Sequence, residues 1–417
     1  MSWGKKFWRS IGPGFITGAA DDDPSGIGTY SQTGAMFGYG QLWLALFSYP
    51  FMTAIQEMCG RIGLITGTGL SGVIKKYYSK KVLYVAVLLL LIANTVNIGA
   101  DLGAMAASVQ LIAPVPFNVL LIGITLIVLA LEIYVPYPTY AKFLKYLTLS
   151  LLAYIATAFL IHPDWSAIAR ATFTPHIAFN KDYILNIAAF LGTTISPYLF
   201  FWQADEEVEE EIVRHETVNI GDDAPSYTSA DVHQVKVDTA VGMFFSNLMT
   251  FFIIVAGTLG LSGMHTITTA SDAASALKPL AGDWAFLLFT LGIVGTGLLA
   301  VPVLAGSAGY AISETFGWKE GLGKKFSQAH GFSGVIAVAT LVGLLVNFTS
   351  IGSITMLYYS AMLNGLLAPP LMILILFIGN NKKILGERTN SKLSNTLGII
   401  ITIIMNLVAV SFLWVVL

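Results

Sequence analysis

An apolar segment near the start of the chain runs directly into three aspartates and a proline, Asp21-Asp22-Asp23-Pro24. A charged side chain inside a membrane-spanning segment is costly, and proline lacks the backbone donor that a continuous helix requires. Such a break is tolerated within a bilayer only where it is buried in protein or lines a polar cavity. The feature therefore predicts a discontinuous transmembrane helix with an ion site at the break.

A second apolar segment carries a comparable interruption, Gly192-Thr-Thr-Ile-Ser-Pro-Tyr198. Interrupted spans in corresponding halves of a chain point to the substrate site of a secondary transporter. This break offers hydroxyls and freed backbone carbonyls but no charge. Oxygen donors without sulfur or imidazole suit magnesium, calcium or manganese better than softer metals. A proline kink whose hydroxyls only satisfy freed backbone groups is the alternative interpretation.

Composition supports a membrane protein, because 55% of the 417 residues are hydrophobic and only 11% are charged, against about 25% charged in soluble domains. We expect residues 1–417 to form a single transmembrane domain. The lone cysteine, Cys59, excludes an internal disulfide, and no basic tract indicates nucleic acid. The predicted partners are divalent metal ions and the lipid bilayer. No cofactor and no obligatory protein partner are indicated.

Apolar stretches long enough to cross a bilayer number about eleven and predict an all-α integral membrane protein. With the N-terminus in the cytoplasm, every Lys and Arg except Arg170, Lys181 and Lys278 falls on the cytoplasmic side, as positively charged inner loops require. The C-terminus then lies outside. The expected spans are 11–37, 42–60, 82–106, 116–134, 143–161, 183–203, 237–262, 284–312, 333–349, 351–378 and 395–416.

Five spans precede the second interrupted helix, so it enters the membrane from the side opposite to the first. This order predicts an inverted repeat of five helices in 11–162 and five in 183–379, with discontinuous helices 1 and 6 meeting near the midplane. The span 395–416 is an additional helix. The segment Lys5 to Ala20 superficially resembles a signal peptide, but it ends at aspartates instead of a neutral cleavage site.

Among the carboxylates of the first break, Asp23 is the best ligand candidate, because a residue before proline is pushed out of helical geometry. Unwinding there also exposes the carbonyls of Ala20 and Gly26 as neutral ligands. Capping of the following helix by Asp23 is an alternative that does not exclude metal binding. Asp21 and Asp22 are expected to make the vestibule polar.

Three further acidic features lie outside this break. Asp101 is a second intramembrane carboxylate, and a supporting role at the site, a proton site and a packing hydrogen bond all remain open for it. The run from Asp205 to Glu211 is expected to be a solvated helix extension, with cation attraction at the inner mouth as the alternative. Glu57 and Arg61 have the spacing of a local ion pair.

Four motifs together resemble the Nramp family of divalent-metal transporters: Gly12-Pro-Gly-Phe15, Asp23-Pro-Ser-Gly26, Gly60-Arg-Ile-Gly-Leu-Ile-Thr-Gly67 and Thr194-Ile-Ser-Pro-Tyr198. The similarity follows the order of elements over nearly the whole chain. The resemblance implies a fold of two inverted five-helix repeats, with a metal held between helices 1 and 6.

Departures from the family pattern concern the metal ligands. Family transporters of manganese and iron have Asp-Pro-Gly-Asn in helix 1 and Met-Pro-His in helix 6. Here Gly26 replaces the asparagine, Ser196 replaces the methionine and Tyr198 replaces the histidine. Thr193 occupies the position whose backbone carbonyl binds the metal in the family. In helix 3 the family's Asp-x-x-Glu becomes Asp101-x-x-Ala104.

Losing the thioether removes the soft ligand that favours transition metals, and a smaller residue at position 26 leaves room for a partly hydrated ion. Losing the histidine and the glutamate removes two groups that titrate near neutral pH. The pattern resembles the Nramp-related magnesium transporters. That resemblance implies transport of Mg²⁺ and Mn²⁺ without obligatory proton coupling. The expected metal ligands are Asp23, Ala20, Gly26, Thr193 and Ser196. The residues expected beside the site or along the pathway are Asp22, Thr194, Tyr198 and Asp101.

The hypothesis from the sequence is therefore a non-enzymatic importer of Mg²⁺ and Mn²⁺ in the plasma membrane, expected to be a bacterial inner membrane. A proton-coupled manganese or iron importer is the alternative of the same class. A sodium-coupled amino-acid carrier is disfavoured, because three aspartates would repel a substrate carboxylate. An intramembrane aspartyl protease pairing Asp23 with Asp101 is the enzymatic alternative, without a supporting protease motif.

Overall fold

The described part of the computed structural model consists of helices and their connections, with no strand in residues 12–135, 151–160, 163–213, 220, 227–261, 267–324 and 326–416. The remaining residues, including residues 5–11 of the segment that resembles a signal peptide and part of the expected span 143–161, lie outside this description. An all-α architecture agrees with the prediction from the sequence.

Two helix breaks occur where the sequence predicts them. Helix α2 (Pro13–Asp21) ends at the aspartates and α3 (Pro24–Phe37) begins at Pro24, with Asp23 in extended geometry as its N-cap. Helix α11 (Lys181–Thr194) and α12 (Pro197–Val213) are separated by Ile195 and Ser196. Proline at the first helical position lacks only a donor that a helix start leaves unpaired anyway. The same residue that stops one half-helix thus starts the next.

Long continuous helices surround these four half-helices. They are α4 (Trp43–Thr66), α6 (Lys80–Gln110), α7 (Phe117–Tyr134), α13 (Ser229–Gly260), α16 (Ala285–Phe316), α17 (His330–Val346), α18 (Ser353–Gly379) and α20 (Lys392–Val416). Shorter helices are α5 (Leu70–Tyr77), α9 (Leu152–Leu160), α10 (Trp165–Phe173), α14 (Ala270–Ala274), α15 (Lys278–Ala281) and α19 (Lys382–Leu385). Short 3₁₀ segments are Gly38–Gln41, Ser275–Leu277 and Gly282–Trp284.

Seven helical segments of the described residues are long and apolar enough to cross a membrane, with α11 and α12 counted together. The expected number of eleven is therefore not established by length and hydropathy alone. Helix α17 has 17 residues, and α2, α3 and α9 are shorter still. Half-helices fall below a length criterion because a break divides the span, and the inverted repeat stays a prediction.

Glycines set the contacts of both broken helices. A Cβ added at Gly18 of α2 would lie 2.4 Å from the Gly242 carbonyl on α13, and one at Gly34 of α3 would lie 2.5 Å from the Ile254 carbonyl. On α11, a Cβ at Gly192 would lie 2.1 Å from the Ala361 carbonyl of α18. Small residues of this kind let helix backbones approach closely in membranes. Each broken helix therefore packs tightly against one continuous helix.

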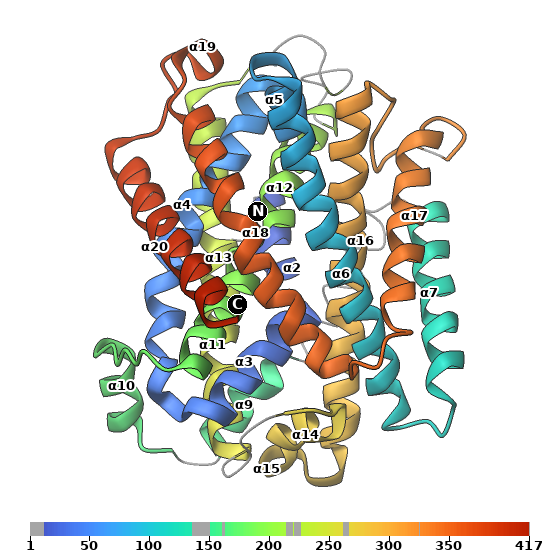
Figure 1. Cartoon of the computed structure of the whole chain (residues 1–417), viewed down its shortest axis with the longest axis vertical. Helices are drawn as coiled ribbons and strands as arrows, with labels where there is room; N and C mark the ends of the chain where they lie inside the picture. The colour runs from blue at the N-terminus through green and yellow to red at the C-terminus, as the bar shows by residue number, and fades with distance from the viewer. Residues whose placement is uncertain are drawn as a thin grey trace, which may run out of the picture.

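Figure 1 shows the resulting arrangement, with α2 and α12 inside the bundle, α7 and α17 side by side at one edge, and α20 at the opposite edge. The outer position of α20 agrees with its exposure, because only 22% of the residues in its apolar 18-residue stretch are buried. By contrast, 83% of the residues in the corresponding stretch of α11 and α12 are buried. The two broken helices are thus shielded from lipid by the continuous ones.

Candidate functional site

Asp23 lies at the centre of the first break and is 1% exposed. Its Oδ1 accepts hydrogen bonds from the Ser25 hydroxyl at 2.6 Å and the Gly26 amide at 2.7 Å. Its Oδ2 accepts one from the Asn97 side-chain amide at 2.8 Å. The capping role weighed from the sequence is therefore present. A carboxylate has about four acceptor sites, so these three donors leave it able to bind a cation.

Three contacts join the first break to the second. The hydroxyls of Ser25 and Thr193 are 3.1 Å apart, and those of Tyr30 and Thr194 are 2.9 Å apart. The Tyr198 hydroxyl donates to the Ala20 carbonyl at 2.9 Å. Residues 164 to 178 positions apart in the sequence are thus brought into direct contact. The structure confirms that the two interruptions meet.

Two of the backbone oxygens expected as metal ligands already accept a hydrogen bond. The Ala20 carbonyl bonds Tyr198, and the Thr193 carbonyl lies 2.7 Å from the Ser196 hydroxyl. Ser196 also lies 2.8 Å from the Gly192 carbonyl, so its hydroxyl serves the local backbone. A carbonyl has two lone pairs, and each can accept a second partner. The metal roles of Ala20, Thr193 and Ser196 remain proposals.

Gly26 lies beside the carboxylate, and the Tyr30 ring borders the same position, 3.2 Å from a Cβ added there. A Cβ added there would lie 3.3 Å from the Asp21 carbonyl and 3.5 Å from Asp23 Oδ1. Gly26 thus borders the backbone oxygen of Asp21 as well as the carboxylate, whereas reasoning from the sequence singled out the carbonyl of Ala20. Both carbonyls belong to the last turn of α2, whose final carbonyls have no partner within the helix.

Two buried amides near Asp23 were not predicted. Asn97 of α6 donates to Asp23 Oδ2 and lies 3.4 Å from Asp101 Oδ2, while Asn364 of α18 donates to Asn97 Oδ1 at 3.3 Å. Asn97 is 0% and Asn364 is 1% exposed. Asp101 is also fully buried, and its Oδ1 has no hydrogen-bond partner. A polar amide inside an apolar span is the signal that identifies such residues.

Asp21 and Asp22 lie beside α13 and are buried in this conformation, and their expected contribution to a polar vestibule stays a prediction. The Ser246 hydroxyl donates to Asp21 Oδ2 at 2.5 Å and lies 3.5 Å from Asp22 Oδ1. The two residues are 0% and 4% exposed, and Asp21 Oδ1 has no hydrogen-bond partner. Among the described residues, no three His, Cys, Asp or Glu side chains converge as a metal site. A cation at the break would therefore rely on Asp23 and neutral oxygens.

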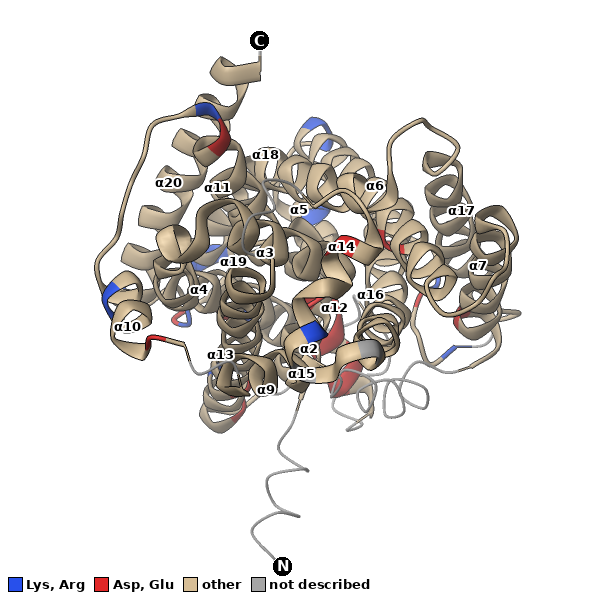
Figure 2. Cartoon of the chain, turned by 90° about the horizontal axis from the view of Figure 1, so that it is seen from below, with Lys and Arg blue, Asp and Glu red and all other residues tan. Residues whose placement is uncertain are grey.

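The acidic run of α12 is buried, so the expectation of a solvated helix extension is wrong. Asp205 is 0%, Glu207 5% and Glu211 2% exposed. Figure 2 shows acidic segments near α12 and α2 in the middle of the projected bundle, with several basic segments at its periphery. Because α12 runs through the interior of the helix bundle (Figure 1), its carboxylates lie between other helices.

One reason for this burial is the contact between α12 and the start of α5. A Cβ added at Gly69 would lie 1.8 Å from Asp205 Oδ1 and 2.9 Å from Glu314 Oε2. Glu314 accepts hydrogen bonds from the amides of Gly69 and Gly72 at 2.6 and 2.8 Å. Burial, with Glu314 nearby, raises the pKa of Glu320 in the following connection to about 10. This end of the bundle thus holds several carboxyl groups close together.

The site is closed toward the end of the molecule that carries the α2 N-terminus. Asp238 of α13 accepts hydrogen bonds from the amides of Gly12 at 3.0 Å and Phe15 at 3.2 Å, which fixes the start of α2. Glycine contacts between α2 and α13 follow directly along the helix. Nearby, Glu57 and Arg61 form the predicted ion pair at 2.7 Å.

Asn186 of α11 closes the opposite side. Its amide donates to the Thr33 hydroxyl at 2.9 Å and to Gln41 Oε1 at 2.6 Å. The Tyr358 hydroxyl of α18 donates to Asn186 Oδ1 at 3.0 Å. One side chain thereby joins α3, α11 and α18. With both ends closed, Asp23 has almost no access to solvent in this conformation.

A profile of the family described as "Natural resistance-associated macrophage protein-like" matches residues 14–415. The chain belongs to the Nramp family. A relative from Caldanaerobacter subterraneus, described as "Divalent metal cation transporter MntH", is 24% identical over 404 residues, which cover 95% of this chain and 90% of the relative. Another with the same description, from Pectobacterium carotovorum, is 26% identical over 318 residues, covering 73% and 72%.

Solved structures agree in fold. The manganese transporter of Eremococcus coleocola superposes with a TM-score of 0.76 at 15% identity and covers 99% of this chain and 88% of that one. Mhp1, a nucleobase-cation-symport-1 family transporter in a closed conformation, gives a TM-score of 0.59 at 12% identity, covering 97% and 92%. The relatives of this Nramp protein are transporters, not enzymes, in agreement with the prediction of a non-enzymatic role.

Proposed function

We propose that this Nramp protein carries divalent metal cations across a membrane by alternating access, with the cation bound at Asp23 between the two broken helices. The observation that supports this most directly is the junction of the breaks, where a buried carboxylate and the hydroxyls of Ser25 and Thr193 lie together. Freed backbone carbonyls at both breaks add neutral oxygen ligands. The MntH relatives are described as divalent metal cation transporters.

Magnesium is the proposed principal cargo, with manganese as a second. The polar groups at the site are the Asp23 carboxylate with nearby hydroxyls, carbonyls and amides. Their oxygens are hard metal ligands, and the other groups can hydrogen-bond the water of a hydrated ion. Ser196 supplies no sulfur, and its hydroxyl is directed to the carbonyls of its own helix. Magnesium gives up its water reluctantly and is usually held through few carboxylates, which suits a site with one central aspartate.

Transport is proposed to proceed without obligatory proton coupling. The position of the family histidine holds Tyr198, whose hydroxyl bonds the Ala20 carbonyl, and the position of the helix 3 glutamate holds Ala104. Inward movement needs no proton gradient, since a divalent ion crossing 100 mV releases about 4.6 kcal/mol. This direction assumes the proposed bacterial inner-membrane location, with a cytoplasmic N-terminus and an external C-terminus.

A proton-coupled manganese or iron importer is the second candidate, and one observation favours it. Asp101 is fully buried, lies beside Asn97 and has one carboxylate oxygen without a hydrogen-bond partner. Such a group can take up a proton that leaves when a cation binds nearby. The proteolytic alternative has no comparable support, because Asn97 lies between Asp23 and Asp101.

Alternating access is proposed to use the two closures seen around the site. Release of Asp238 from the start of α2 would open one side, and release of Asn186 from Thr33 and Gln41 would open the other. The proposed repeats, 11–162 and 183–379, place α2 and α3 in one half and α11 and α12 in the other. Motion of one half against the other is the usual consequence of this architecture.

Uptake into proteoliposomes that contain the purified protein tests the proposal. Mg²⁺, Mn²⁺ and Ca²⁺ are compared under a defined potential while internal pH is recorded. We expect potential-driven Mg²⁺ uptake without acidification, and its loss in Asp23→Ala. Mn²⁺ uptake with matching acidification, absent for Mg²⁺ and lost in Asp101→Asn, would instead establish the proton-coupled candidate. Uptake of none of the three ions by correctly folded protein would contradict both.

A further inference from the structure

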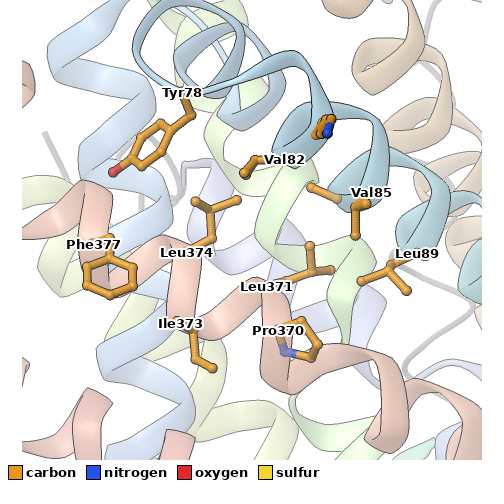
Figure 3. Close-up of a pocket in the computed structure, with 11 residues that line it drawn as sticks. Tyr78, Val82, Val85, Leu89, Pro370, Leu371, Ile373, Leu374 and Phe377 are labelled. Atoms are coloured by element: carbon orange, nitrogen blue, oxygen red, sulfur yellow. The ribbon is translucent and has the colours of Figure 1, made fainter.

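An apolar hollow, separate from Asp23 and its hydrogen-bond partners, lies on the outer surface between α6 and α18. It has a volume of about 490 Å³. Figure 3 shows side chains of both helices converging on it, with Pro370, Leu371 and Leu374 from α18 opposite Val82, Val85 and Leu89 from α6. Apart from Tyr78 and Lys81, all of its lining residues are apolar. We call this hollow the α6–α18 groove.

The groove opens toward the surroundings of the helix bundle. Val85 is 55% and Phe377 64% exposed, and Val82 and Ile373 are 37% and 39% exposed. Both helices are long and apolar enough to span a membrane. A soluble protein would leave such a surface in water at a considerable cost, but here its neighbour is lipid. A hydrocarbon chain of a lipid matches this apolar lining.

Positive charge is concentrated at one end of the groove. Lys81 belongs to its lining, and Lys80 precedes it at the start of α6; both are exposed. The Tyr78 side chain lies near that of Asn381, which is the N-cap of α19, and Lys382 and Lys383 follow Asn381 in the sequence. None of the lining residues is acidic. The charge of Lys80 and Lys81 thus favours a negative group at this end.

We propose that the α6–α18 groove binds one anionic phospholipid, with an acyl chain along the apolar lining and the phosphate at Lys81. Basic residues beside a membrane-spanning helix attract anionic lipid headgroups, and apolar contact along the groove adds the chain. The site is independent of the cation transported. It lies on the two helices that supply Asn97 and Asn364, so a bound lipid braces the supports of Asp23.

Native mass spectrometry of the purified full chain tests this site. Phosphatidylglycerol and phosphatidylcholine with identical acyl chains are titrated into the detergent-solubilised protein. We expect one phosphatidylglycerol to bind at least about fivefold more tightly than phosphatidylcholine, as one lysine near a headgroup provides. Lys81→Glu should remove this preference, and Val85→Trp should reduce retention of both lipids because the indole fills the groove.

Matched substitutions elsewhere serve as controls. Lys319→Glu makes the same charge change at an exposed residue off the groove, and Val119→Trp places the same ring on α7, where Val119 is 59% exposed. Neither should alter lipid retention. Equal retention by wild type, Lys81→Glu and Val85→Trp would overturn the proposal, as would equal affinity for the two lipids. Thermal unfolding verifies that each variant is folded. If Val85→Trp does not fold, Lys81→Glu alone tests the preference for the anionic headgroup.

Discussion

The two helix breaks have the same architecture but different chemistry. Between α2 and α3, Asp23 provides a full negative charge that three donors hold in place. Between α11 and α12, only hydroxyls and carbonyls are present, and Ser196 is directed to its own helix. One break therefore supplies charge, and the other supplies shape and neutral oxygens. The comparison implies that affinity depends mainly on the first break and selectivity mainly on the second.

Removal of the charge at the first break should have the largest effect. Asp23→Asn keeps the side-chain size but leaves the cation without its only central carboxylate, and truncating one partner of a buried charge pair typically costs about 2–5 kcal/mol. We expect Mg²⁺ affinity to fall at least about 30-fold and uptake to be lost. Isothermal titration calorimetry and proteoliposome uptake measure this.

Asp272→Asn is the control for charge alone, because Asp272 is the third residue of helix α14 and forms a capping box there with the N-cap Thr269. It should transport normally. If Asp23→Asn keeps the affinity of wild type, the cation does not bind at the first break and the comparison between the breaks fails.

The support of Asp23 should have the next largest effect. Asn97→Ala removes the donor to Asp23 Oδ2 and leaves Asn364 without its acceptor. Loss of a group that orients a metal ligand typically reduces affinity about 10–100-fold, and we expect a reduction in that range. Asn94→Ala is a matched control on the same helix, since Asn94 is also buried but bonds Leu304 and Ser307 of α16. Equal loss of affinity in both variants would indicate general damage to α6.

The second break should control the choice of metal. Ser196→Met introduces a thioether where the present hydroxyl bonds the Gly192 and Thr193 carbonyls. A soft ligand favours Mn²⁺ over Mg²⁺, so we expect the ratio of the two affinities to shift by about tenfold toward Mn²⁺. Ser196→Leu has similar bulk without sulfur and should produce no such shift. Competition uptake of the two ions decides the result, and an unchanged ratio contradicts a selectivity role for this break.

Local sequence patterns were sufficient to predict the breaks, the ion pair of Glu57 with Arg61 and the approximate bounds of the long helices in the described residues. Each depends on neighbours in the chain: proline position, helical spacing or a run of apolar residues. The partners of Asp23 were harder to predict, because Asn97 and Asn364 lie on helices whose rotation about their axes is set by packing. The acidic run of α12 was misjudged for the same reason, since Asp205 meets the start of α5 and Glu314, neither adjacent in sequence.

Removal of the hydrogen bond between the breaks should change Mg²⁺ affinity least. Unlike the substitutions of Asp23 and Asn97, it should raise the affinity. Tyr198→Phe removes the hydrogen bond to the Ala20 carbonyl, and a buried carbonyl without a partner costs about 1–3 kcal/mol. The protein without metal should therefore unfold at a lower temperature. If Ala20 ligates the cation, bound metal satisfies the carbonyl, and Mg²⁺ affinity should rise about fivefold. Tyr30→Phe is the matched control, because its hydroxyl bonds the Thr194 hydroxyl and no proposed ligand; it should lose stability without gaining affinity. Equal behaviour of the two variants in calorimetry and thermal unfolding would exclude the Ala20 carbonyl as a ligand.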